Sequence, residues 1–276
     1  MEQNQYKKQF LATFHDLTRR YDKHRVFTDF VTMMSITLSQ ATQAIGGVKK
    51  DEQEEKVFLD IERQYKQKVI QGPFTKLFAA TVLGLEHEKG DWLGEIYSEL
   101  NLGNSSLGQF FTPFHVSKLM AKLVLGDQNS IHSEIRKKGY VTLSEPTCGS
   151  GGMVLAFAEV FRETGLNSAT QLFVVAQDIS STAACMCHIQ LSLCGIPALV
   201  QNKDSLSFEP PFWARYTPAF YLMGWPFKLM RKSGAREETP ENKQDVEDRA
   251  VSKTKQPSAT DKKPKKSLLT YFRELF

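Results

Sequence analysis

Residues 147–152, Thr-Cys-Gly-Ser-Gly-Gly, are the stretch of this sequence best suited to bind a small ligand. They follow an extended run, residues 141–145, and precede an apolar run, residues 153–161. A strand, a glycine loop and a helix in this order bring backbone N–H groups and a helix N-terminus against a polar ligand. Glycines suit such a loop because a Cβ would block the ligand and because these loops often need a positive φ.

Three kinds of ligand use loops of this type. A triphosphate loop ends in Gly-Lys-Ser/Thr, and no lysine is present here. A dinucleotide loop reads Gly-x-Gly-x-x-Gly with an acid about 20 residues on; here the third glycine is missing and Asp178 lies further away, so a dinucleotide-binding oxidoreductase is disfavoured. The third ligand, S-adenosylmethionine, needs an acid at the tip of the second strand for its ribose hydroxyls. Residues 172–178 are predicted to be that strand, ending at Asp178.

Four segments of the chain resemble the adenine-N6 DNA methyltransferases, above all the modification subunits of type I restriction systems. Residues 145–152 resemble the family's D/E-P-x-C-G-S-G-G loop. Residues 108–116 resemble its G-x-F-[FY]-T-P-x-x-[VI] segment, residues 176–179 its G-Q-[DE]-[IL], and residues 203–206 its G-D-[ST]-L. The chain also resembles a group of phage and plasmid proteins that carry these motifs.

The resemblance implies a binding site for S-adenosylmethionine. Asp178 would accept hydrogen bonds from the ribose, and Asp204 would accept one from the adenine amine, although a turn-capping role is an alternative for Asp204. Residues 111–113 would fold over the methionine side, while Thr112 and Pro113 also fit the cap and first turn of a helix. The implied cofactor-binding residues are Phe111, Thr112, Pro113, Glu145, Pro146, Cys148, Gly149, Ser150, Gly151, Asp178, Ile179 and Asp204.

Methylation of an amine requires a second loop. The target base must leave the duplex, be held by stacking and present its N6 to the methyl sulfonium. The family does this with an Asn/Asp-Pro-Pro-Tyr/Phe loop after a fourth strand. The candidate catalytic residues here are Glu209, Pro210, Pro211 and Phe212, with Glu in the first position and no apolar strand before them. The missing strand leaves an alternative function open: a catalytically deficient module that binds the cofactor, DNA or a partner protein, such as a subunit or an anti-restriction decoy.

Several cysteines could suggest other chemistry. Cys148 has no base placed beside it by the sequence, so we expect no covalent catalysis. Cys185, Cys187 and His188 could suggest a metal site. However, positions one and two apart point to different sides of a helix, and no second ligand pair has zinc spacing. We predict a core helix over residues 180–193 and no metal.

The sequence before residue 105 reads as helical, because apolar residues recur at helical spacing. The stripes are Phe27, Val31, Met34 and Leu38; Phe58, Ile61, Tyr65 and Val69; and Trp92, Ile96 and Leu100. Gly72 and Pro73 are expected to break this pattern. We predict an N-terminal helical domain, residues 1–105, whose surface could hold DNA or a partner subunit.

The methyltransferase domain is predicted over residues 106–230. Its first helix should bury Val116, Met120 and Leu123, residues 131–140 read as a polar linker, and residues 198–200 as a third strand. The aromatic residues 212–225 are expected to pack on the edge of a truncated sheet, with a stacking wall for a flipped base as the alternative. A disordered charged tail, residues 231–266, and a short apolar segment, residues 267–276, complete the prediction; the latter could dock on a partner.

Composition agrees with this interpretation without proving it. The 276 residues carry a net charge of +4, which is compatible with DNA binding. No apolar run approaches the roughly 20 residues of a membrane span, no signal core is present, and four cysteines suit a reducing cytoplasm. The resemblance thus implies an α/β protein: a truncated Rossmann-like class I methyltransferase sheet with a helical domain, acting as a cytoplasmic adenine-N6 DNA methyltransferase of a phage, plasmid or similar element.

Overall fold

The computed structural model describes residues 5–88, 90–103 and 111–234. The chain divides into two compact units, Met1–Met223 and Gly224–Phe276. The described part of the second unit is helix α13 (Trp225–Gly234), which extends past residue 231, where we predict the tail to begin. The rest of that tail and the apolar segment 267–276 lie outside the described residues. No helix in the described part is long and apolar enough to cross a bilayer.

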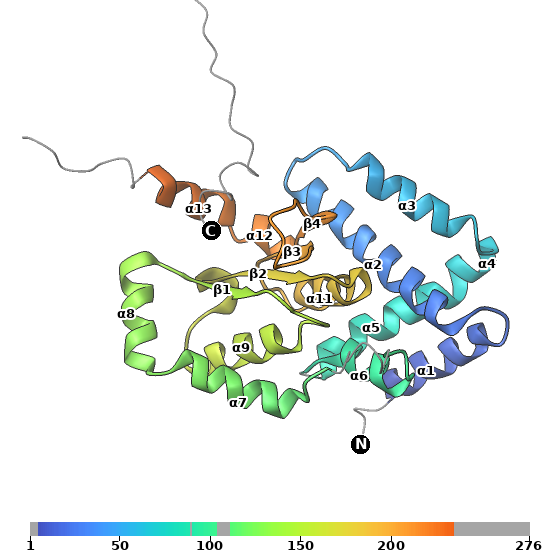
Figure 1. Cartoon of the computed structure of the whole chain (residues 1–276), viewed down its shortest axis with the longest axis horizontal. Coiled ribbons are helices and arrows are strands. Elements are labelled where there is room, and N and C mark those ends of the chain that lie inside the picture. Colours follow the sequence, from blue (N-terminus) through green and yellow to red (C-terminus); the bar gives the residue numbers. More distant parts are fainter. Residues whose placement is uncertain (1–4, 89, 104–110, 235–276) are drawn as a thin grey trace, which may run out of the picture. The chain divides into compact units, whose positions relative to one another are not determined.

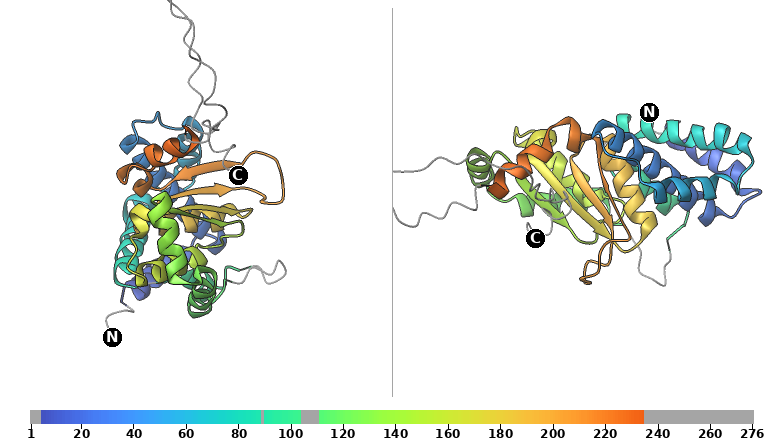
Figure 2. Two further views of the ribbon diagram at one scale, coloured as in Figure 1. Left: turned by 90° about the vertical axis from the view of Figure 1, so that its left-hand side faces the viewer. Right: turned by 90° about the horizontal axis from the view of Figure 1, so that it is seen from above.

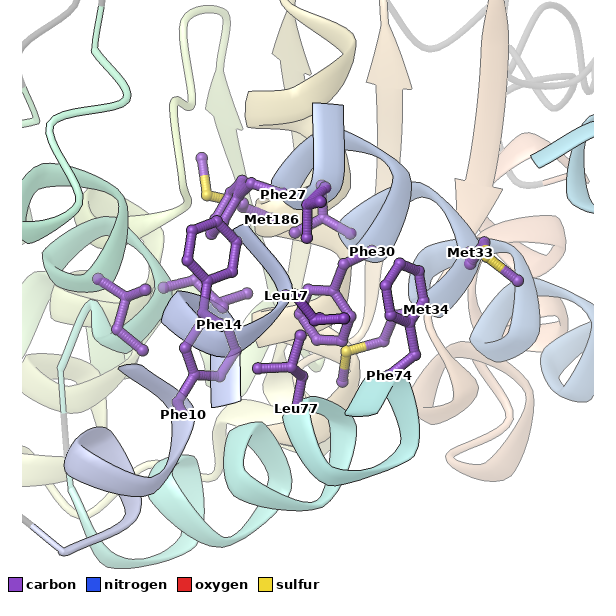
Figure 3. Close-up of a cluster of buried hydrophobic side chains, with 14 of the residues drawn as sticks. Phe10, Phe14, Leu17, Phe27, Phe30, Met33, Met34, Phe74, Leu77 and Met186 are labelled. Atoms are coloured by element: carbon purple, nitrogen blue, oxygen red, sulfur yellow. The ribbon is translucent and has the colours of Figure 1, made fainter. Parts of the chain in front are cut away.

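The first unit begins with the predicted helices (Figure 1). They are α1 (Gln5–Thr18), α2 (Lys23–Ile45), α3 (Glu52–Glu62), α4 (Gln67–Val69), the π-helical turn η1 (Ile70–Phe74), α5 (Thr75–His87) and α6 (Trp92–Glu99). Their aromatic faces meet in one buried cluster, in which Phe10, Phe14, Phe27 and Phe30 are at most 2% exposed (Figure 3). As predicted, Gly72 and Pro73 interrupt the α-helical pattern, but they do so within a π-helical turn rather than a loop. Since proline has no N–H to donate, the turn around it widens to π-helical geometry and continues into α5.

The sheet forms in the second part of this unit. The elements are α7 (Phe114–Leu125), α8 (Gln128–Lys138), β1 (Val141–Glu145), α9 (Gly152–Glu163), α10 (Ser168–Gln171), β2 (Leu172–Asp178), α11 (Ser181–Leu193), β3 (Ala198–Asn202), β4 (Trp213–Tyr216) and α12 (Pro218–Leu222). The four strands are ordered β1-β2-β3-β4; the first three are parallel and β4 is antiparallel to β3. The α/β class and the predicted strand at residues 172–178 are confirmed. As predicted, an aromatic residue from α12, Phe220, packs on the sheet, with its ring 5.7 Å from that of Phe173.

Helix α7 corrects one prediction. Met120 and Leu123, expected on its buried face, are 44% and 74% exposed. The buried residues are Ser117 and Ala121, one turn apart, on the helix that packs against α9. Small side chains allow two helices to approach closely. The larger apolar residues of α7, Met120 and Leu123, therefore lie on its exposed side. Pro113 is the N-cap residue rather than the first helical residue, and no side chain caps this helix.

Most of residues 131–140, the predicted linker, belong instead to helix α8, which ends at Lys138. Asp127 caps its start by accepting a hydrogen bond from the Ser130 N–H, at 3.1 Å. Gly139 ends it in the left-handed conformation, with φ of 79°. Only Ile135 is buried. The prediction was wrong because α8 has only two large apolar residues, Ile131 and Ile135, one turn apart among polar ones. Its caps, Asp127 and Gly139, are the stronger signal.

Helix α11 is buried on all sides and joins the two cores. Cys185, Met186 and Ile189 belong to the cluster formed by the N-terminal helices. Ala184, Cys187 and Leu191 belong to the cluster formed by the sheet, α7 and α9. A helix that is apolar all round is expected in the interior. The core helix predicted over residues 180–193 is therefore confirmed, whereas a domain boundary between residues 105 and 106 stays a prediction.

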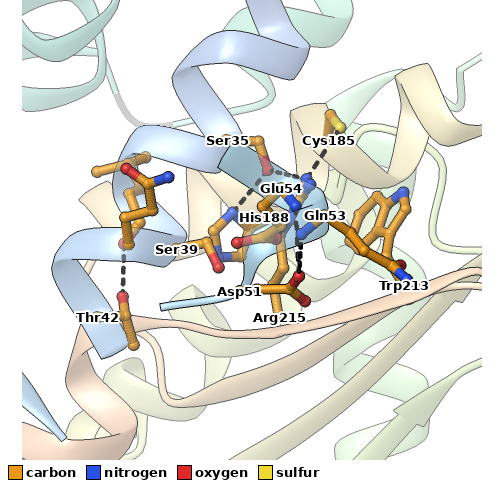
Figure 4. A network of polar contacts seen from close by, with 12 residues as sticks. Ser35, Ser39, Thr42, Asp51, Gln53, Glu54, Cys185, His188, Trp213 and Arg215 are labelled. Atoms are coloured by element: carbon orange, nitrogen blue, oxygen red, sulfur yellow. Dashed lines mark hydrogen bonds and ion pairs between the residues drawn. The ribbon is translucent and has the colours of Figure 1, made fainter. Parts of the chain in front are cut away.

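A buried polar network attaches β4 to the N-terminal helices (Figure 4). Arg215 forms an ion pair with Glu54 of α3, and its Nη1 donates to Ser35 Oγ of α2, at 2.8 Å. Ser35 lies 2.9 Å from Nδ1 of His188, and the Nε2 of His188 lies 3.2 Å from the carbonyl oxygen of Tyr216. Because a carbonyl can only accept, Nε2 carries the proton and Nδ1 accepts from Ser35. A neutral imidazole satisfies every partner.

Acid should destabilise the protein through His188. Burial, and then the charge of Arg215, lower the pKa of His188 to about 3, whereas an unfolded histidine titrates near pH 6.5. Because the unfolded chain then binds a proton that the folded chain does not, stability falls as pH drops below about 6.5, by about 3 kcal/mol at pH 4. Urea unfolding between these pH values measures the slope. His188→Asn should flatten it, and an unchanged slope would contradict the assignment.

Candidate functional site

A hollow lies at the carboxyl ends of the parallel strands. Its walls come from the glycine loop, the first turn of α9, the start of α11 and the end of β2. Phe111, Thr112, Ser117, Asp91 and Tyr97 complete the lining. Its volume is about 210 Å³, which corresponds to roughly seven waters at about 30 Å³ each. The protein's own side chains therefore leave space here for a ligand.

The glycine loop is clamped between protein elements. A Cβ on Gly149, whose φ is +54°, would lie 3.0 Å from the ring of Phe111. A Cβ on Gly152 would lie 2.8 Å from a carboxylate oxygen of Asp91. The expectation that glycines leave room for a ligand is thus incomplete, because both of these glycines are also required by contacts within the protein. Gly149 thus packs against Phe111, and Gly152 packs against Asp91.

Asp178 ties this loop to the end of β2. Its Oδ2 accepts a hydrogen bond from the Gly149 N–H, and its Oδ1 accepts one from the Ser180 N–H, both at 2.8 Å. Two carboxylate oxygens offer about four acceptor positions. Each oxygen of Asp178 can therefore accept a further hydrogen bond, and the side chain lines the hollow. This geometry suits a ligand with a pair of hydroxyl groups.

Asp91 is a residue of the hollow that the sequence analysis missed. It accepts hydrogen bonds from the Ser150 hydroxyl, from Gln190 Nε2 at 2.8 Å and from the Gly94 N–H at 3.0 Å. Burial raises the pKa of this carboxyl. The sequence could have shown Asp91 as the N-cap of α6, but not its contact with a loop 59 residues away.

The corner at residues 111–113 covers part of the hollow. Phe111 lies over Gly149 and contacts Tyr97 edge-on, with ring centroids 5.4 Å apart. Thr112 also lines the hollow, whereas Pro113 is exposed and does not. The three residues of the motif before Phe111, residues 108–110, lie outside the described part of the chain. The corner thus supplies an aromatic wall and a hydroxyl.

The structure brings together some of the predicted cofactor residues. Those that line the hollow are Phe111, Thr112, Cys148, Gly149, Ser150 and Asp178. Three others are neighbours of the lining residues in the chain. Glu145 is the last residue of β1 and accepts a hydrogen bond from the Thr147 N–H at 3.3 Å, Pro146 is exposed, and Gly151 is the N-cap residue of α9.

The last two predicted cofactor residues do not line the hollow. Ile179 is 67% exposed, and Asp204 accepts a hydrogen bond from the Leu206 N–H, at 3.0 Å, within its own turn. Ligand contacts by these residues stay predictions.

The candidate catalytic residues Glu209, Pro210, Pro211 and Phe212 lie on a loop that projects beyond the strands (Figure 2). This loop precedes β4, which is antiparallel, rather than following a parallel strand. Phe212 is 80% exposed, and none of the four residues lines the hollow. Within the described residues, no strand pairs with the outer edge of β1. Their catalytic role stays a prediction.

The cysteines and His188 have separate surroundings. A hydrogen bond with Cys187, together with burial, raises the pKa of Cys148 well above its usual value, so this thiol stays protonated and is a poor nucleophile. Cys185 contacts Arg215, whereas His188 contacts Ser35. In the described ranges, no three His, Cys, Asp or Glu residues are grouped to hold a metal ion.

Comparison with known proteins identifies one protein family and one solved structure that are similar to this chain. Residues 88–223 match the model of the family described as N-6 DNA Methylase. A similar solved structure is the methyltransferase subunit of a type I restriction-modification system from Streptococcus thermophilus, with 16% identity and a TM-score of 0.41. The similarity covers 76% of this chain and 60% of that subunit, so the chain spans about 60% of its length. No curated protein matches the chain.

Proposed function

Residues 88–223 match the model of the N-6 DNA methylase family, and on this premise we propose that the hollow binds S-adenosylmethionine for methylation of adenine N6 in DNA. The observation that carries the proposal is the position of Asp178. Its carboxylate is fixed against the glycine loop by two backbone N–H groups and retains an acceptor position on each oxygen. The vicinal hydroxyls of a ribose fit such an acceptor pair.

Each part of the hollow then has a role. The glycine loop and the N-terminus of α9 hold the methionine end, and Phe111 and Thr112 cover it. Asp178 accepts from the ribose, and Asp204 is the candidate acceptor for the adenine amine. When bound, the cofactor supplies an electrophilic methyl sulfonium. The chain contributes by positioning the reacting groups, with Glu209 to Phe212 as the candidate acceptors for the amine hydrogens of a flipped base.

The order and direction of the strands favour a second function, binding without methylation. The four strands of the sheet end with an antiparallel strand, and the candidate catalytic loop precedes that strand. A parallel strand that could present the loop beside the hollow is not among the described residues. The chain would then bind the cofactor, DNA or a partner protein without methylating. It would be a subunit completed by another chain, or a decoy acting on restriction systems.

Calorimetry with S-adenosylmethionine tests the binding site. The natural chain should bind it, and Asp178→Ala should bind at least about 100-fold more weakly, because each hydrogen bond to a charged acceptor contributes about 1.5–3 kcal/mol. Asp127→Ala is the matched control, since Asp127 caps α8 and does not line the hollow. No binding by the natural chain, or equal affinities for all three proteins, would reject the site.

Methyl transfer from labelled cofactor to unmethylated DNA separates the two functions. Transfer by the purified chain would establish the methyltransferase and eliminate the second function. Cofactor binding without transfer to any DNA would reject catalysis by this chain alone. Methyl transfer that occurs only after a partner subunit is added would identify the chain as one part of a larger enzyme.

A further inference from the structure

A groove in the helical half of the first unit has no role in the function proposed above. Its volume is about 810 Å³, and its walls come from α1, the turn after α1, α4, η1 and the first turn of α5. These helices lie at the end of the unit opposite α8 (Figure 1). No residue lines both this groove and the hollow. A ligand bound here would not compete with the cofactor.

Positive charge gathers around this groove, which we call the basic groove. Its basic lining residues are Arg19, Arg20, Lys66, Lys68 and Lys76. The one acid in the lining, Asp16, lies 3.5 Å from Arg19 and offsets that charge. Within the described part of the chain, the side chains of Arg20 and the three lysines form no ion pair. Four unpaired cations around a concave surface attract a polyanion.

The shape of the basic groove also suits an extended ligand. Its apolar lining includes Leu17 and Val69, which are buried, whereas the basic residues are exposed. The π-helical turn η1, with Pro73 inside it, forms part of the wall between Lys68 and Lys76. Single π-helical turns are frequent at functional sites. Gln9 and Tyr21 add polar side chains of the types that contact phosphate oxygens.

We propose that the basic groove binds the phosphate backbone of duplex DNA. The charge and shape indicate a polyanion, and the choice of DNA rests on the proposed function. Contacts of this kind position a protein on the duplex without reading its sequence. Their signature is a strong dependence of affinity on salt, because each neutralised phosphate releases counterions.

Fluorescence anisotropy with a short labelled DNA duplex and the full chain tests the proposal. The groove variant combines Arg20→Gln, Lys66→Gln, Lys68→Gln and Lys76→Gln. The control variant combines Lys50→Gln, Lys56→Gln, Arg136→Gln and Lys137→Gln, which remove the same charge from exposed positions outside the groove. The groove variant should bind at least about 30-fold more weakly at 100 mM salt, with a log–log salt slope shallower by about 3. The control should lose less than about threefold.

Three results would overturn the proposal: equal losses in the two variants, no binding of duplex DNA by the natural chain, or tighter binding of RNA, mononucleotides or acidic peptides than of duplex DNA. S-adenosylmethionine calorimetry on the groove variant keeps the two sites separate. If the variant binds S-adenosylmethionine with unchanged affinity, it is folded, and its weaker DNA binding results from the changes in the groove. Conversely, a chain that binds DNA through the groove but does not bind the cofactor would refute the proposed function and leave the groove supported.

Discussion

Replacing Glu54 by alanine should lower the free energy of unfolding by about 4 kcal/mol. The two side chains of the Glu54–Arg215 pair are only 8% and 4% exposed. Removal of the carboxylate would leave the Arg215 guanidinium buried with neutral partners, Ser35 and Cys185, and over the ring of Trp213. A buried charge without a counter-ion is among the most destabilising changes in a folded protein. Urea unfolding followed by fluorescence measures the loss.

Two variants give this measurement its controls. Asp60→Ala removes an exposed ion pair with Arg63 at the end of the same helix and should cost at most about 0.5 kcal/mol. The double variant Glu54→Ala with Arg215→Met should recover most of the loss, because it removes both charges. A loss below about 1 kcal/mol for Glu54→Ala, or no recovery in the double variant, would show that the pair contributes little to stability.

Replacing Asp91 by alanine should cost about 3 kcal/mol of stability and weaken S-adenosylmethionine binding at least about tenfold. The Ser150 hydroxyl, the Gln190 amide and the Gly94 N–H would each lose their acceptor. A buried donor left unpaired costs about 1–3 kcal/mol. Since Ser150 belongs to the glycine loop, the loop would also lose one of its fixed points. Denaturant unfolding and calorimetry report the two effects separately.

Asp91→Asn is the matched variant for this test. It keeps the oxygen that accepts from Gln190 and Gly94, and its amide can donate to the Ser150 hydroxyl, which also accepts. We expect it to lose less than about 1 kcal/mol and to retain cofactor binding. Equal loss of binding in both variants would mean that the charge of Asp91, rather than its hydrogen bonds, is what matters. An unchanged S-adenosylmethionine affinity in Asp91→Ala would show that cofactor binding does not depend on the hydrogen bond between Ser150 and Asp91.

The local parts of the hollow can be predicted from the sequence. A strand, a glycine loop and a helix are encoded by neighbouring residues, so residues 141–161 and the strand ending at Asp178 are visible as patterns. The aromatic stripes of the N-terminal helices are local for the same reason. In each case, backbone geometry and side-chain periodicity act over a few residues.

The tertiary structure brings together groups that are distant in the sequence. Asp91 reaches Ser150 across 59 residues, and Glu54 reaches Arg215 across 161, and no local spacing encodes either contact. It also decided that α7 buries Ser117 rather than its larger apolar residues, because close packing against α9 selects small side chains. The basic groove likewise exists only because folding places the end of α1 beside α4 and α5. Such contacts depend on the three-dimensional path of the chain, which periodicity and motifs do not specify.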